Sequence, residues 1–223
     1  MVCFRNRSMF EEKDTIHIFP YPVWLFSLDG SRADQINQQA IRSIESMRNA
    51  EPAGIPGAHW QSPNDLQDQD NFADLVTTIR DATQEIFSEL QIATDKFLVT
   101  GMWINLRPPG TQHPAHTHPN NYLSGTYYVT APSGGDAIVF RDPRPETNII
   151  SPQFSEQNEL NTREIMVPVK PGAMVMFPSW LPHFVPPNQG DSDRISISFN
   201  VMFESYGETI SRPKWTFQRS KSK

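Results

Sequence analysis

The sequence predicts a mainly β protein, a β-sandwich or barrel, with a layer of helices at its N-terminal end. Three observations support this fold class. Short apolar runs separated by Gly, Pro, Asn and Asp fill residues 97–205. Apolar residues at helical spacing come before them. Twenty prolines in 223 residues favour turns and short strands. We therefore expect an extended arm and helical layer over 1–96, a β core over 97–205 and a basic C-terminal tail over 206–223.

The N-terminal arm, within residues 1–30, contains the apolar segment IHIFPYPVWLFSL. Pro20 and Pro22 lie in its middle. Because proline cannot donate to a central ladder of a sheet, the segment predicts an edge strand or an arm lying over the core.

Two helices are expected between the arm and the β core. The first should begin at Ser31, because Ser31 and Asp34 resemble a capping box. It carries an apolar stripe of Ile36, Ala40, Ile44 and Met47. Three prolines and two glycines in EPAGIPGAHWQSPND end it. The second should run from about Phe72 to Leu90, with a buried face of Phe72, Val76, Ile79, Ala82, Ile86 and Leu90. Both stripes indicate scaffold rather than a binding groove.

The strands of the core are expected at six apolar runs: KFLVTGMWINL, YLSGTYYVTA, DAIVFRD, REIMVPV, GAMVMFP and RISISFNVMF. A long connection over 141–164, rich in Pro, Asn and Glu, separates the third run from the fourth. Such a connection is either a functional lid near a site or a surface excursion, and both readings stay open.

Composition restricts the classes of partner. A net charge of −6 argues against a general nucleic-acid partner, and the basic run KWTFQRSKSK is typical of a solvated tail. Cys3 is the only cysteine, so no internal disulfide forms, and a reducing, cytoplasmic location fits. No apolar run approaches the roughly 20 residues of a membrane span. Glu11, Glu12 and Asp14 stand where an export signal would be apolar.

Histidines in the β-rich part predict a metal site. His116 and His118 are two residues apart, so on a strand or its frayed end they face the same side. His183, at the start of a later strand, can supply a third imidazole. His113 has the wrong parity relative to both and is expected to point elsewhere. A lone histidine is more often structural, but a same-face pair with a distant third favours metal.

Arg194 and Ser196 share strand parity in RISIS and can face the same interior as the histidines. An arginine among apolar strand residues is costly to bury without an anion. Its planar guanidinium suits a carboxylate held by two hydrogen bonds, and a serine hydroxyl can add another. The alternative is an ion pair between Arg194 and Asp191 or Asp193 at the strand entrance.

The segments HTH, SGTYYV, PGAMVMFPSWLPHFV and RISISFN occur in this order and spacing. In them the sequence resembles the iron(II)/2-oxoglutarate oxygenase superfamily, closest to its prolyl-hydroxylase-like branch and within it to a group of 2OG-Fe(II) oxygenases. The resemblance covers about 97–205 and implies a double-stranded β-helix, the jelly-roll fold of cupins. It implies that His116 and His183 are iron ligands. It further implies a co-substrate site of Arg194, Ser196 and Tyr128 for the distal carboxylate of 2-oxoglutarate, with Asn105 as a pocket candidate.

One position departs from the superfamily. The usual motif is H-x-D or H-x-E, whereas here the third ligand position is His118. Asp136 and Asp142 are the nearest acids downstream, but their spacing does not match the motif. We therefore keep His118 as the third ligand. Three-histidine iron sites do occur in cupin-type dioxygenases that do not use 2-oxoglutarate.

The resulting hypothesis is an iron(II)- and 2-oxoglutarate-dependent dioxygenase. It would hydroxylate an unidentified peptidyl or small polar substrate while 2-oxoglutarate is decarboxylated to succinate, with ascorbate as a candidate reductant. No catalytic residue is expected beyond the metal ligands. The alternatives are a three-histidine cupin-type dioxygenase or other metalloenzyme that does not use 2-oxoglutarate, and a non-catalytic β-barrel binding module.

Overall fold

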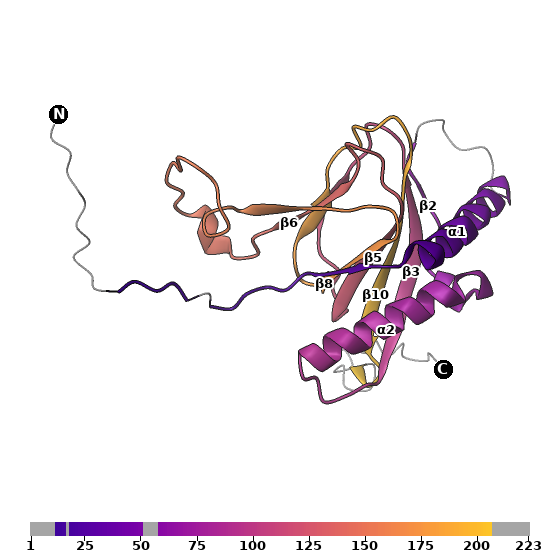
Figure 1. Ribbon diagram of the computed structural model, residues 1–223, viewed down its shortest axis with the longest axis horizontal. Helices are drawn as coiled ribbons and strands as arrows, with labels where there is room; N and C mark the ends of the chain where they lie inside the picture. Colours follow the sequence, from indigo (N-terminus) through magenta and orange to yellow (C-terminus); the bar gives the residue numbers. More distant parts are fainter. Residues whose placement is uncertain (1–11, 17, 51–57, 207–223) are drawn as a thin grey trace, which may run out of the picture.

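The computed structural model describes residues 12–16, 18–50 and 58–206. These residues form two antiparallel sheets and two helices, α1 (Gly30–Ala50) and α2 (Ala73–Glu89). The helices pack on the outer face of the larger sheet (Figure 1). None of the described helices is long and apolar enough to cross a membrane. Cys3 and residues 207–223 of the expected tail lie outside the described part of the chain.

The larger sheet has the strand order β1-β8-β5-β10-β3-β2, and the smaller sheet has the order β4-β9-β6-β7. The strands are β1 (Trp24–Ser27), β2 (Trp60–Gln61), β3 (Phe97–Arg107), β4 (His113–His116), β5 (Leu123–Thr130), β6 (Ala137–Arg141), β7 (Glu164–Pro168), β8 (Ala173–Pro178), β9 (His183–Val185) and β10 (Arg194–Phe203). From β3 onward the chain crosses repeatedly from one sheet to the other. Two facing sheets with these crossings form a double-stranded β-helix, which confirms the predicted fold class.

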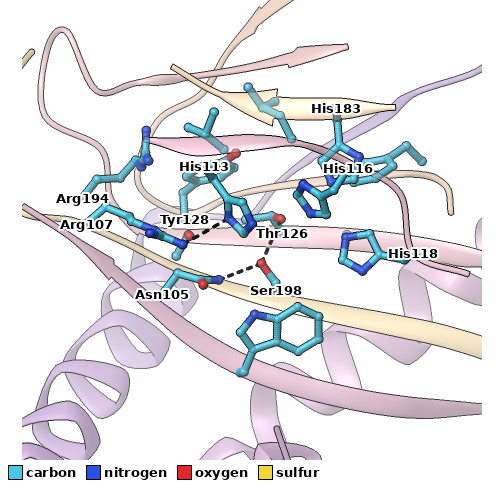
Figure 2. A pocket seen from close by; sticks show the side chains of 16 residues that line it. Asn105, Arg107, His113, His116, His118, Thr126, Tyr128, His183, Arg194 and Ser198 are labelled. Carbon is cyan, nitrogen blue, oxygen red and sulfur yellow. Dashed lines mark hydrogen bonds between the residues drawn. The ribbon is translucent and has the colours of Figure 1, made fainter. Parts of the chain in front are cut away.

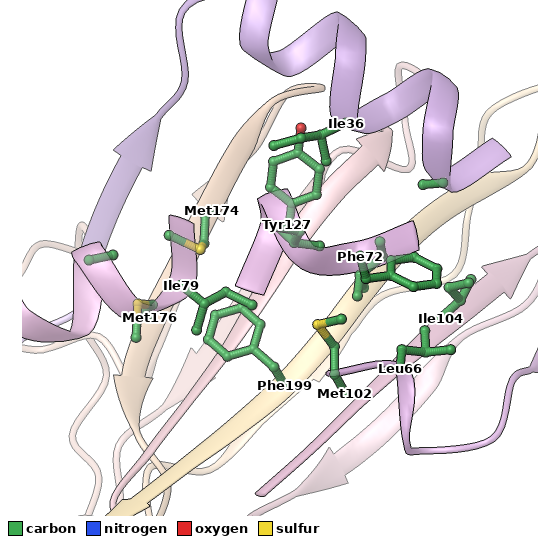
Figure 3. Packing of buried hydrophobic residues seen from close by; sticks show 14 of the residues in the cluster. Ile36, Leu66, Phe72, Ile79, Met102, Ile104, Tyr127, Met174, Met176 and Phe199 are labelled. Atoms are coloured by element: carbon green, nitrogen blue, oxygen red, sulfur yellow. The ribbon is translucent and has the colours of Figure 1, made fainter. Parts of the chain in front are cut away.

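The main core lies between the helices and the larger sheet (Figure 3). Ile79 of α2 and Ile36 of α1 pack against strand residues such as Met102 and Phe199, all of them buried. Alternate residues of β10 therefore face the helices, and the residues between them face the second sheet. The predicted scaffold role of both helical stripes is confirmed, although Leu90, at the end of the second, is exposed.

The first helix begins one residue earlier than predicted, and its cap is different. The Asp29 carboxylate accepts hydrogen bonds from the Arg32 backbone N–H (3.1 Å) and from the Ser31 hydroxyl. The expected capping box of Ser31 and Asp34 is therefore wrong. An aspartate two residues ahead of Ser31 is an equally good N-cap, and the helix begins behind it.

The N-terminal arm ends in β1, which pairs with β8 at the edge of the larger sheet. This confirms the edge strand predicted from Pro20 and Pro22. The β6–β7 hairpin, drawn in orange, extends away from the helices, and its connection contains a short 3₁₀ helix, Pro145–Asn148 (Figure 1). No described residue of that connection lines the pocket between the sheets.

Candidate metal centre and co-substrate pocket

Three histidines meet at one end of the pocket between the two sheets. His116 ends β4, His183 begins β9, and the two lie directly opposite each other in the antiparallel pair. His118 follows β4, and its backbone N–H donates to the Ser179 carbonyl (2.9 Å). One ligand atom from each imidazole lies within 4.8 Å of the other two. The predicted cluster of three is therefore brought together by strands that are far apart in the sequence.

Hydrogen bonds fix the tautomer of two of these rings. His116 Nδ1 lies 2.9 Å from the Pro114 carbonyl oxygen, and His183 Nδ1 lies 2.9 Å from the Leu181 carbonyl oxygen. Because a carbonyl oxygen only accepts, each Nδ1 carries the proton and donates it. Each Nε2 therefore keeps a free lone pair, which is the form in which imidazole binds a metal.

Burial favours the uncharged form of two of the three imidazoles, His183 and His118. It lowers the pKa of His183 to about 3, against the opposing effect of the hydrogen bond to Leu181, and the neighbouring His116 and His118 lower it further. Burial also lowers the pKa of His118 to about 4, with smaller contributions from His116 and His113. The ring of His118 stacks on that of His183, with centroids 5.2 Å apart and planes 6° apart. Near neutral pH both imidazoles are thus neutral and able to act as ligands.

The predicted orientation of His113 is wrong. Its parity predicted a side chain pointing elsewhere, yet it lines the pocket, and its ring stacks on His116 with centroids 4.3 Å apart. The reason is a register shift in β4 between His113 and His116, which cancels the expected alternation. Arg107 Nη2 donates to His113 Nδ1 over 3.2 Å, since a guanidinium only donates.

Arg194 lies at the opposite end of the pocket from the metal cluster (Figure 2). It is only 2 % exposed, and burial lowers its pKa. Its Nη1 makes one long hydrogen bond, 3.4 Å, to the Gly135 carbonyl. Among the described residues no carboxylate pairs with it, so the alternative of an ion pair with Asp191 or Asp193 is wrong. A desolvated cation without a counter-ion is costly, and it favours a bound anion.

The remaining predicted residues line the same pocket through cross-strand registers. Ser196 of β10 lies opposite Asn105 of β3 and Tyr128 of β5. Tyr128 is 1 % exposed, and burial raises the pKa of its hydroxyl. The Tyr128 hydroxyl and the Asn105 Oδ1 atom are buried without a hydrogen-bond partner among the described residues. Unsatisfied buried polar atoms around Arg194 mark a place for a polar ligand.

Trp103 and Arg107 are among the lining residues that the sequence did not predict. The Trp103 ring stacks on His118, with centroids 6.0 Å apart and planes 29° apart. Both residues share the parity of Asn105 on β3, so the alternation that placed Asn105 in the pocket could also have placed them there.

The double-stranded β-helix fold is shared with solved proteins that include an α-ketoglutarate-dependent epimerase and a prolyl-4-hydroxylase. Residues 101–200 match the family model described as "Putative 2OG-Fe(II) oxygenase". This match confirms the predicted resemblance to the iron(II)/2-oxoglutarate oxygenase superfamily, and it spans all the predicted site residues.

Solved structures show the same fold at low sequence identity. The non-haem α-ketoglutarate-dependent epimerase SnoN from nogalamycin biosynthesis has a TM-score of 0.59 and 13 % identity, over 82 % of this chain and 79 % of its own. HygX from Streptomyces hygroscopicus, solved with nickel and 2-oxoglutarate bound, has a TM-score of 0.54 and 12 % identity, over 82 % of this chain and 83 % of its own. A prolyl-4-hydroxylase from Pseudomonas putida has a TM-score of 0.53 and 14 % identity, over 82 % of this chain and 93 % of its own. The search of the curated proteins gave no match.

Proposed function

We propose that this protein is an iron(II)- and 2-oxoglutarate-dependent dioxygenase that hydroxylates a peptidyl or small polar substrate. One observation carries the proposal: a single pocket has three clustered imidazoles at one end and, at the other, a buried arginine with no carboxylate partner among the described residues. The two ends match the two needs of this chemistry, which are a metal ion and a dicarboxylate. The likeness to HygX, a protein solved with nickel and 2-oxoglutarate bound, supports the same pairing here.

His116, His118 and His183 fit an iron ion. Their ligand atoms lie within 4.8 Å of one another, and the hydrogen bonds of His116 Nδ1 and His183 Nδ1 to backbone carbonyls leave Nε2 of each ring free to bind a metal. Such hydrogen bonds orient metal-binding imidazoles and make them more basic. With dioxygen as the oxidant, bound iron would couple oxidative decarboxylation of 2-oxoglutarate to succinate and carbon dioxide with hydroxylation of a substrate C–H bond, one oxygen atom entering succinate and the other the product.

Arg194, Ser196 and Tyr128 fit the distal carboxylate of 2-oxoglutarate. The Arg194 guanidinium has free donors, and a charge-assisted bond to a carboxylate is stronger than its present bond to the Gly135 carbonyl. The unpartnered Tyr128 hydroxyl stays protonated, because burial raises its pKa, and can donate to the same group. Asn105 donates through Nδ2 to Ser198 Oγ (3.0 Å) and leaves its Oδ1 facing the pocket.

A second candidate rests on His118. With an imidazole in place of the usual carboxylate, the ligand set matches three-histidine dioxygenases that do not use 2-oxoglutarate. Such an enzyme has no need of a buried arginine at the far end of its pocket. Arg194 therefore favours the 2-oxoglutarate-dependent reaction.

Iron(II) titration of the purified, metal-free protein under anaerobic conditions tests the ligand set. The wild type should bind one iron per chain, whereas His116→Ala and His183→Ala should abolish binding. His118→Ala should weaken binding at least ~10–100-fold, the range of a supporting residue. His59→Ala, an exposed histidine outside the pocket, is the matched control and should bind normally.

Normal iron binding by His118→Ala would show that the ligand set is wrong. The reaction itself is tested by succinate formation after addition of iron(II), 2-oxoglutarate and ascorbate, with no prime substrate present. An iron-loaded, folded protein that neither binds 2-oxoglutarate nor forms succinate would favour the three-histidine alternative.

A further inference from the structure

Arg107 is a second buried arginine in the pocket to which the fold and the family resemblance assign no role. It is the last residue of β3, lies directly opposite Arg194 in the β3–β10 pair, and is 7 % exposed. Its Nη2 donates to His113 over 3.2 Å, its Nη1 reaches the Gln112 carbonyl over 3.5 Å, and its Nε has no partner. No ion pair involves it within the described residues.

The charge of the pocket makes this arrangement unfavourable without a ligand. A guanidinium has five donors, and Arg107 uses two of them, one at the limit of hydrogen-bond distance. Burial lowers the pKa of both arginines, and the like charge of Arg107 further lowers the pKa of Arg194. Aspartate and glutamate are absent from the residues that line the pocket. Two positive charges therefore face a space that a dianion would neutralise.

The two guanidinium groups point to different parts of that space (Figure 2). Arg194 lies at the end remote from the histidine cluster. Arg107 reaches toward the cluster, because its partner His113 stacks on the ligand candidate His116. One arginine thus serves the far end of the pocket, and the other serves the side of the metal centre.

We infer that Arg107 binds the carboxylate of 2-oxoglutarate that adjoins its keto group, while Arg194 binds the distal carboxylate. The inference rests on the proposed function and adds a second recognition residue to it. One arginine for each carboxylate gives each buried guanidinium an anionic partner. It also supplies a donor for the carboxylate oxygen that faces the protein at the metal end.

The test measures the affinity of the protein for two keto acids by calorimetric titration. The protein is loaded with nickel, which takes the place of iron and is redox-inert. The first is 2-oxoglutarate. The second is 2-oxopentanoate, which has the same carbon chain and keto acid group but no distal carboxylate. Arg107→Met should weaken binding of both keto acids by roughly 10–100-fold, the loss expected for one charge-assisted hydrogen bond. Arg194→Met should weaken 2-oxoglutarate alone.

Two further variants complete the design. Arg107→Lys keeps the charge without the planar fork and should bind both keto acids at an intermediate affinity, which also serves if the methionine variant does not fold. Arg80→Met changes an exposed arginine on α2 and should bind like the wild type. Nickel affinity should be unchanged in every variant, since no arginine is a ligand.

Three results would overturn the inference. Wild-type affinity of folded Arg107→Met for both acids would leave Arg107 without a role in co-substrate binding. Loss of 2-oxoglutarate alone would place Arg107 at the distal carboxylate. A parallel loss of nickel affinity would show that Arg107 only supports His113 and His116. Failure of the wild type to bind either acid would instead refute the proposed function.

Discussion

Replacing Arg194 by methionine should change two measurable quantities in opposite directions. The substitution keeps much of the side-chain volume and removes the charge. In the ligand-free protein Arg194 is 2 % exposed and has one hydrogen bond, of 3.4 Å. The folded state therefore carries a poorly compensated buried cation, and removing it should raise the thermal unfolding midpoint of the ligand-free protein.

The same substitution should weaken 2-oxoglutarate binding. A hydrogen bond to a charged group contributes roughly 1.5–3 kcal/mol, which corresponds to a loss of affinity of about one to two orders of magnitude. Arg194→Lys keeps the charge but cannot form two parallel bonds to one carboxylate, so its affinity should also fall. Iron binding should survive both changes, because Arg194 lies at the other end of the pocket from the three histidines.

Anaerobic titration of the iron-loaded protein with 2-oxoglutarate measures this loss through the metal-to-ligand charge-transfer band. Thermal unfolding of the ligand-free protein measures the stability. An unchanged titration curve for folded Arg194→Met would refute the assignment of Arg194 to the distal carboxylate of 2-oxoglutarate. A lowered unfolding midpoint in the absence of ligand would show that Arg194 has a compensating partner in solution.

Three further outcomes are expected. His118→Asp should retain iron and support 2-oxoglutarate turnover, and complete loss of metal in the folded variant would show that the site requires an imidazole. Gly125→Ala would place its methyl group on the buried Phe199 ring and should cost ~1–3 kcal/mol in urea denaturation, whereas Gly30→Ala, with open space around it, should not. The metal-free protein should lose thermal stability as pH falls below about 6.5, because the pKa values of His183 (about 3) and His118 (about 4) lie below the ordinary 6.5 and the unfolded chain takes up more protons. A midpoint that is flat with pH would contradict this.

The elements of the fold could be predicted where the pattern is local. Alternation and turn residues located six strands of the core, and helical spacing located both helices, whereas the short strands β4 and β9 were not among the predicted apolar runs. The cap of the first helix could not be chosen this way. Asp29 and Ser31 are both good N-cap residues, and their identity does not decide which one the chain uses. The order of strands within each sheet depends on contacts between residues far apart in the sequence, and no local pattern encodes it.

Within the site, too, some residues could be predicted from local sequence patterns and others could not. His116, His118 and His183 could be grouped because two share a strand face and the third begins another strand. Parity failed at His113, since a register shift within β4 reverses the direction of its side chain, and such a shift leaves no mark in the residue types. Arg107 was missed although its parity was correct, because a charged residue at a strand end is usually solvated.

The three imidazoles are held in place by different contacts. The difference matters because His118 stands where the superfamily usually has a carboxylate. His116 and His183 each donate Nδ1–H to a backbone carbonyl two residues earlier, so their rings are oriented by the chain itself. For His118 the described residues supply only ring contacts, with His183 on one side and Trp103 at 6.0 Å. No hydrogen bond therefore demands an imidazole at this position. A carboxylate at the same place would lose stacking and gain a charge beside a bound metal, which is why we expect His118→Asp, of the three possible replacements, to retain iron.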